Sequence, residues 1–227
     1  MLPTSNCSSA SGGAFFAGAA AVMQAVESQN LILYHTDLSG QWPAEGARAL
    51  ALRLPYLKRL ALGSGGDAAR ASLAGIALAL RALGALLGRR VDAGEIAFAS
   101  GEKPRMVEAA TVPDFSISHS GAWVACAAIA GAQVGLDIEV GTESRSAQWV
   151  VREALLKAAG AGLRAVDHVR GIEVPESTLP HASLRWRGEC WYLRRLHMFP
   201  GASACVLTSR PVHLVPHGVG LAELFAT

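Results

Sequence analysis

The sequence has few cysteines, and no two of them are closely spaced. Among its 227 residues the cysteines are Cys7, Cys126, Cys190 and Cys205. No CxxC motif occurs, and most of these cysteines have apolar neighbours, as small core residues do. The sequence therefore indicates neither a zinc site nor a disulfide framework.

A strong net charge is also lacking. The formal net charge is +2, which argues against binding driven by bulk attraction to nucleic acid or to a membrane surface. The apolar stretch 12–26 has no Lys or Arg before it, and it is too short to span a bilayer. We interpret residues 1–29 as a flexible extension. We expect a cytoplasmic protein that is monomeric and binds neither membrane nor nucleic acid.

Basic residues are unevenly distributed along the chain. None occurs before Arg48, whereas the segment 48–90 is rich in Arg and Lys and contains Asp67 as its single acid. This distribution favours binding of an anionic ligand. A helical region with a merely solvated face would produce the same pattern.

The composition and periodicity indicate an α+β protein. The chain is 51% hydrophobic, which is sufficient for one large domain or two small ones. Apolar spacing predicts helices over 44–54, 67–87 and 147–162 and strands over the remaining apolar segments. The predicted strands are 31–38, 95–100, 114–120, 122–130, 134–140, 163–174, 183–198 and 202–209. Helices would pack on antiparallel strands in each of two similar halves, residues 30–112 and 113–227.

Two carboxylates interrupt the apolar segment VGLDIEV, Val134–Val140. Successive side chains of a strand point to opposite faces, so Asp137 and Glu139 share one face while Leu136 and Ile138 share the other. An amphipathic strand with one solvated face would show the same alternation.

A second charged pair lies on the helix predicted after residue 147. Glu153 and Lys157 are four residues apart, which places them on the same helix face. Taken alone, this is an ordinary ion pair of an exposed helix.

The order of four motifs gives these pairs a context. The chain contains EKP, FSISHSG, VGLDIE and WVVREALLKAAGAGL in that order. This series resembles the Sfp-type 4'-phosphopantetheinyl transferases, whose motifs are GKP, an FNxSHS-like segment, GxDIE and WxxKExxxKxxGxGL. The resemblance runs from about residue 31 to near the C-terminus.

The resemblance implies a two-half transferase fold with its active site at the interface of the halves. Such an enzyme moves the phosphopantetheine arm of coenzyme A to a serine of an apo acyl or peptidyl carrier protein. It requires Mg²⁺ and releases adenosine 3',5'-bisphosphate.

The resemblance also implies roles for individual residues. Asp137, Glu139 and Glu153 match the metal ligands, and Glu153 would also accept the serine proton. Lys157 matches the lysine beside the transferred phosphate, and His119 matches the histidine that contacts the nucleotide phosphate. Electrostatics supports a metal between Asp137 and Glu139, because two carboxylates on one strand face repel unless a cation lies between them. Mg²⁺ prefers such oxygen ligands.

The nucleotide-binding residues are matched in the same way. Lys103, Pro104 and Ser118 fall where the family holds the adenine end of coenzyme A. Lys58 and Arg70 are the nearest matches for the contacts to the 3'-phosphate.

Two departures from the family pattern leave alternatives open. Glu102 replaces the glycine of GKP, and only 140–148 separates the acidic strand from the following helix, where the family has a longer insertion that helps to receive the carrier. A Mg²⁺-dependent phosphohydrolase would use the same charged residues with water in place of the serine. A non-catalytic protein that binds coenzyme A or a carrier is the other alternative.

Overall fold

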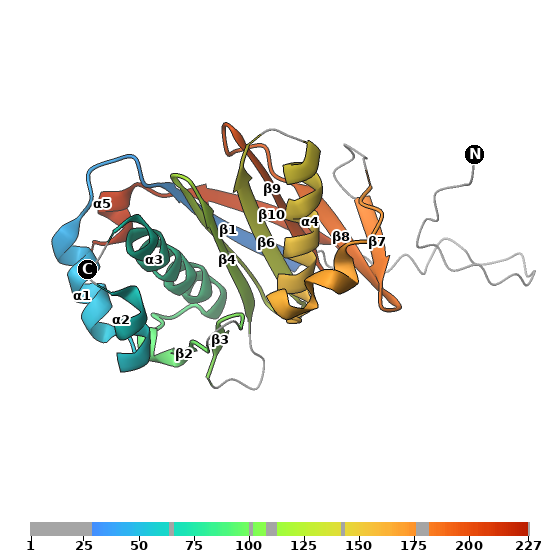
Figure 1. Ribbon diagram of the computed structural model, residues 1–227. Helices are drawn as coiled ribbons and strands as arrows, with labels where there is room; N and C mark the ends of the chain where they lie inside the picture. The colour runs from blue at the N-terminus through green and yellow to red at the C-terminus, as the bar shows by residue number, and fades with distance from the viewer. Residues whose placement is uncertain are drawn as a thin grey trace, which may run out of the picture.

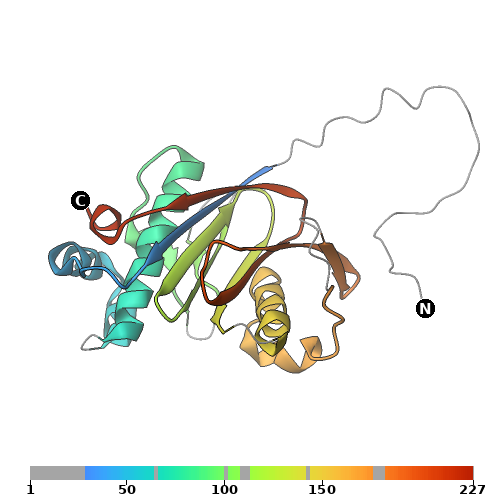
Figure 2. The same ribbon diagram turned by 90° about the horizontal axis from the view of Figure 1, so that it is seen from above.

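The protein folds into two four-stranded sheets that pack face to face, with helices on both outer faces (Figures 1 and 2). The computed structural model describes residues 29–63, 66–99, 102–107, 113–141, 144–175 and 182–226. The α+β class predicted from the sequence is confirmed. Residues 1–28 of the predicted extension lie outside the described residues, and Gln29 already belongs to a strand.

The first sheet has the strand order β10-β1-β5-β4. Its strands are β1 (Gln29–Asp37), β4 (Asp114–Ser120), β5 (Trp123–Ile129) and β10 (Val212–Gly218). The pairs β1–β5 and β4–β5 are antiparallel, but β10 runs parallel to β1. This sheet thus combines strands from both sides of residue 113, and the division into two halves stays a prediction.

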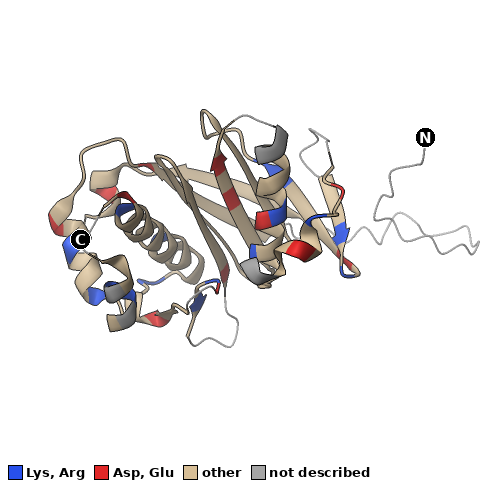
Figure 3. Ribbon diagram, in the orientation of Figure 1, with Lys and Arg blue, Asp and Glu red and all other residues tan. Residues whose placement is uncertain are grey.

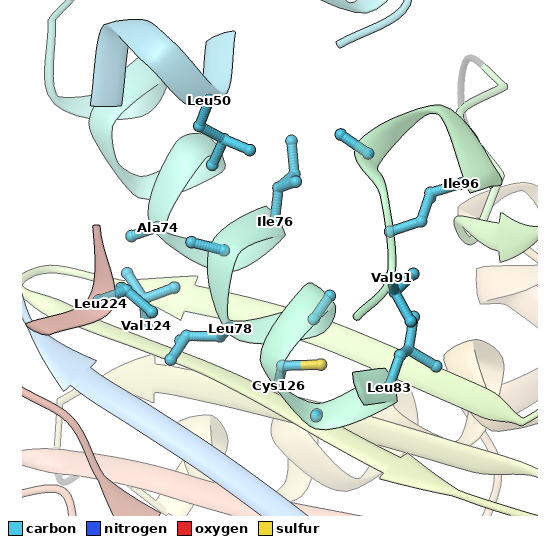
Figure 4. Close-up of a cluster of buried hydrophobic side chains, with 14 of the residues drawn as sticks. Leu50, Ala74, Ile76, Leu78, Leu83, Val91, Ile96, Val124, Cys126 and Leu224 are labelled. Atoms are coloured by element: carbon cyan, nitrogen blue, oxygen red, sulfur yellow. The ribbon is translucent and has the colours of Figure 1, made fainter. Parts of the chain in front are cut away.

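Helices cover the outer face of the first sheet. They are α1 (Ala44–Arg53), α2 (Tyr56–Leu62), α3 (Asp67–Leu87) and α5 (Leu221–Leu224). The longest, α3, has the length and hydropathy of a membrane span, but half of that stretch is buried inside the protein. Figure 4 shows part of this core, in which Leu78 of α3 packs with Val124 and Cys126 of β5. Gly88, in the left-handed region at φ 62°, ends α3, so the helix predicted over 67–87 is confirmed.

The second sheet has the order β6-β9-β8-β7, and all its pairs are antiparallel. Its strands are β6 (Val134–Val140), β7 (Ala182–Trp186), β8 (Glu189–Arg195) and β9 (Ala202–Thr208). Helix α4 (Ser144–Ala158) covers its outer face. A separate core, which includes Leu31, Leu33, Leu136 and Ile138, fills the space between the two sheets.

The remaining elements are short. The 3-10 helix η1 (Ala93–Glu95) leads into β2 (Ile96–Ala97), which pairs with β3 (Arg105–Met106). Of the strand predicted over 95–100, two residues are in a strand among the described residues 95–99.

The strand predicted over 163–174 is wrong. The structure has the 3-10 helix η2 (Leu163–Val169) there, and no strand among residues 163–174. Ala165 and Val169 are buried together against α4. Residues four apart lie on one face of a helix and also on one face of a strand, so this spacing does not distinguish the two elements.

Candidate metal centre

The acidic side chains of β6 face helix α4. Val134, Leu136 and Ile138 point into the core between the sheets, so the alternate residues Asp137 and Glu139 project from the opposite face. Figure 3 shows the acidic segments of β6 beside the part of α4 that carries both acidic and basic residues. The predicted shared face is confirmed, but Asp137 is buried and not solvated.

Gly135 allows α4 to approach β6 closely. A Cβ atom at this position would lie 1.9 Å from the carbonyl oxygen of Ala154 and 2.4 Å from the amide nitrogen of Ala158. Any side chain would therefore push the helix away from the strand. The close approach brings Glu153 and Lys157, one helical turn apart, over Asp137.

Three carboxylates converge at this contact. Ligand oxygens of Asp137, Glu139 and Glu153 all lie within 4.8 Å of one another. Oδ2 of Asp137 is buried and has no hydrogen-bond partner among the described residues. Burial raises the pKa of Asp137 to about 6, against the opposing effect of the Lys157 charge. An all-oxygen set with one unsatisfied buried oxygen fits a hard divalent cation such as Mg²⁺.

Lys157 supplies the positive charge beside the three carboxylates. Its Nζ lies 2.6 Å from Oδ1 of Asp137 and 3.4 Å from Oε1 of Glu153. The ammonium group thus contacts two of the three carboxylates. It offsets part of the repulsion that their proximity would otherwise cause.

Polar side chains of β4 connect the two sheets beside this cluster. Backbone amides of β6 donate to side-chain oxygens of every second residue of β4, over distances of 2.7–3.2 Å. The four donor and acceptor pairs are Val134 to Asp114, Leu136 to Ser116, Ile138 to Ser118 and Val140 to Ser120. We call these four bonds the side-chain ladder. They satisfy amides of β6 that no neighbouring strand pairs on that edge.

This ladder was not predicted, although the sequence contains a signal for it. In DFSISHS the polar residues Asp114, Ser116, Ser118 and Ser120 recur at every second position. This period places all four side chains on one face of the strand. Polar side chains at a sheet edge need hydrogen-bond partners. The backbone amides of alternate residues of β6 provide them.

A cavity of about 270 Å³ opens next to the cluster. It is lined by Lys103, Pro104, Glu153 and Lys157 together with Glu102. Lys103 is largely buried, and its Nζ lies 2.5 Å from Oδ2 of Asp114 and 2.6 Å from the carbonyl oxygen of Val134. Burial lowers its pKa, whereas the charge of Asp114 opposes this effect.

His119, on β4, is also close enough to sense the charges of the cluster. Its ring keeps much of its surface exposed. Partial desolvation lowers its pKa, and the positive charges of Lys157 and Lys58 act in the same direction, against the charge of Glu139. Its exposed position leaves it accessible to a ligand bound beside the cluster.

The two residues predicted to contact the 3'-phosphate, Lys58 and Arg70, lie on α2 and α3. Nζ of Lys58 lies 5.1 Å from the ring centroid of Phe98, and burial lowers the pKa of Lys58. Arg70 is half-exposed, and its described contacts are Asp67 at 3.9 Å and the ring of Trp42. No described contact joins Arg70 to the three carboxylates.

A larger cavity, of about 430 Å³, lies elsewhere, between α1, α3 and α5. Its walls include Leu50, Leu80 and Phe225, and none of the three carboxylates lines it. Size therefore does not identify the site, and the convergence of charged groups does. No protein-family model matches the chain, and no curated protein matches it.

Proposed function

We propose that this protein is a Mg²⁺-dependent 4'-phosphopantetheinyl transferase. It would move the phosphopantetheine arm of coenzyme A to a serine of an apo acyl or peptidyl carrier protein. The observation that carries the proposal is the convergence of Asp137, Glu139 and Glu153 within 4.8 Å, with Lys157 in contact with two of them. These four residues come from two of the four motifs that resemble the family, VGLDIE and WVVREALLKAAGAGL, which lie on β6 and α4.

The proposed roles follow from the chemistry of the groups. Asp137, Glu139 and Glu153 would hold Mg²⁺, which when bound supplies neutralising charge at the diphosphate. Lys157 would bind the phosphate next to the bond that breaks. Glu153, at the edge of the cluster, would take the proton of the carrier serine, and a general base contributes about 100- to 10,000-fold in rate.

The nucleotide would extend from the metal centre into the neighbouring surface. His119, with Lys58 on the same side, would contact its phosphates, since both remain accessible and lie within electrostatic range of one another. The 270 Å³ cavity beside Lys103 and Pro104 has a mixed apolar and charged lining, which suits the adenine end.

The fold that we propose is that of the two-half transferases, with the site where the halves meet. Supporting this, the cavity beside the cluster is lined by Lys103 and Pro104 from residues 30–112 and by Glu153 and Lys157 from residues 113–227. The cytoplasmic location and the monomeric state remain predictions.

The test is the intact mass of a panel of apo acyl and peptidyl carriers after incubation with the protein, coenzyme A and Mg²⁺. We expect one carrier or more to gain the mass of a phosphopantetheine group. A panel that gains no mass at any Mg²⁺ concentration would reject the proposal. A parallel sample without carrier separates the hydrolase alternative, because only a hydrolase would release adenosine 3',5'-bisphosphate from coenzyme A alone.

A further inference from the structure

The hydroxyl of Ser118 makes three contacts at the centre of the site. It accepts the amide of Ile138 at 3.2 Å, as part of the side-chain ladder. It donates to Oδ1 of Asp137 at 2.9 Å, and Nζ of Lys157 lies 3.3 Å from it. The residue is 5% exposed.

These contacts use the whole hydrogen-bonding capacity of the hydroxyl. A serine hydroxyl has one proton to donate and two lone pairs to accept with. The proton goes to Asp137, and the lone pairs face Ile138 and Lys157. Ser118 therefore has no donor or acceptor left for the adenine end of a nucleotide, the role that the family resemblance implies for it.

The contacts instead fix the orientation of one carboxylate. Ser118 and Lys157 both bind Oδ1 of Asp137, at 2.9 Å and 2.6 Å. Oδ2 of Asp137 stays buried and has no hydrogen-bond partner in the part of the chain that the structure describes. Because a carboxylate is planar, fixing one oxygen sets the direction of the other.

We propose that Ser118 is a positioning residue of the metal centre, which holds Asp137 so that Oδ2 is available to a divalent cation. The inference rests on the metal site of the proposed function. Partners that orient a metal-binding carboxylate typically contribute about 10- to 100-fold to metal affinity. Ser118 reaches Asp137 from the first sheet, whereas the three carboxylates belong to the second sheet and to α4.

Ser116 provides a matched control in the same strand. It is buried and accepts the amide of Leu136 at 3.0 Å, so it contributes an equivalent bond to the side-chain ladder. No contact with a carboxylate of the cluster is described for it. Ser116→Ala thus removes only one hydrogen bond of the side-chain ladder. Ser118→Ala removes an equivalent bond and also the contact that orients Asp137.

The experiment measures Mn²⁺ binding to the full chain by electron paramagnetic resonance, without coenzyme A or carrier. We expect Ser118→Ala to bind Mn²⁺ at least about tenfold more weakly than the natural chain, and Ser116→Ala to change the affinity by less than about twofold. Ser118→Thr, which keeps the hydroxyl, should restore most of the affinity. If Ser118→Ala does not fold by circular dichroism, Ser118→Cys keeps the volume with a much weaker donor and should show the same loss.

The outcomes separate this inference from the proposed function. Natural protein that binds Mn²⁺, with unchanged affinity in Ser118→Ala or Ser118→Cys, overturns the positioning role alone. An equal loss in Ser116→Ala also overturns it, since the effect would then be structural. Natural protein that binds no Mn²⁺ overturns the metal centre itself, and with it the proposed function.

Discussion

Lys157 illustrates how one side chain can substitute for a bound cation. Its ammonium lies within 3.4 Å of oxygens of both Asp137 and Glu153. A buried carboxylate without a counter-charge would cost several kcal/mol. The lysine supplies this counter-charge, so a divalent ion bound at Oδ2 of Asp137 must compete electrostatically with the neighbouring ammonium.

Replacing Lys157 should therefore strengthen metal binding while it weakens the proposed transfer. We expect Lys157→Met to bind Mn²⁺ several-fold more tightly at pH 8, because the competing ammonium is gone. Electron paramagnetic resonance of free Mn²⁺ measures this affinity. Lys58→Met is the control, since Lys58 lies outside the cluster and packs on Phe98. The Mn²⁺ affinity of this variant should equal that of the natural chain. Weaker Mn²⁺ binding in Lys157→Met would show that the lysine does not compete with the metal.

At the level of secondary-structure elements, the packing of α4 on β6 determines the geometry of the site. Helix α4 supplies Glu153 and Lys157, and β6 supplies Asp137 and Glu139. The two elements meet at Gly135, where the helix backbone occupies the space that a side chain would take.

Gly135→Ala should lower both stability and metal affinity. The added methyl group would clash with backbone atoms of Ala154 and Ala158, which can move only if α4 moves. Overpacking of this kind typically costs about 1–3 kcal/mol. Urea unfolding measures the free energy, and Mn²⁺ binding measures the site. Gly171→Ala is the control, because a Cβ atom there meets no atom within 4 Å. Equal stability of the two variants would contradict the close-packing role of Gly135.

The hydrogen bonds of Glu95, the last residue of η1, predict how stability depends on pH under acidic conditions. Hydrogen bonds from Arg89 and from the backbone amide of Asp92 lower the pKa of Glu95 to about 2. A lowered carboxyl pKa stabilises the fold above the ordinary value near 4.5 and loses this effect as the pH falls towards 2. Glu95→Gln should be less stable than the natural chain at pH 6, and the difference should shrink by pH 3. Urea unfolding at both pH values tests this, and a difference independent of pH would refute it.

The sequence predicted elements well where hydrophobic periodicity was strong. The helical spacing of apolar residues in α3 and the alternation of apolar and polar residues in β4 and β6 were sufficient to predict those elements. Periodicity misled at 163–174, where apolar residues four apart stand among polar ones. It also gave no signal for β10, whose Pro216 lacks an amide and is tolerated because β10 lies at the sheet edge.

The candidate site was predictable only in its local pairs. Strand alternation placed Asp137 beside Glu139, and helical spacing placed Glu153 beside Lys157. The contact of Lys157 with Asp137 depends on how α4 packs over β6, which neither local period determines. The contact of Ser118 with Asp137 depends in turn on how two sheets meet.

For the whole molecule, the important feature is where the two sheets meet. The side-chain ladder joins the edge strand β4 of one sheet to β6 of the other. The carboxylate cluster lies along this junction, where Asp137 and Glu139 of the second sheet accept hydrogen bonds from Ser118 and Ser120 of the first sheet. A site assembled across a junction is sensitive to any change that separates the two sheets, and such interfaces are common places for ligand binding.

The central claim is that Asp137 and its neighbours hold a metal that transfer requires. Its most direct test is the intact mass of a responsive apo-carrier after incubation with coenzyme A, limiting Mg²⁺ and either the natural chain or Asp137→Asn. The asparagine has the same shape but lacks the charge that binds the cation. We predict that the natural chain adds phosphopantetheine to the carrier. Asp137→Asn should add none while its circular dichroism spectrum stays native. Equal mass gain with both proteins would contradict the account.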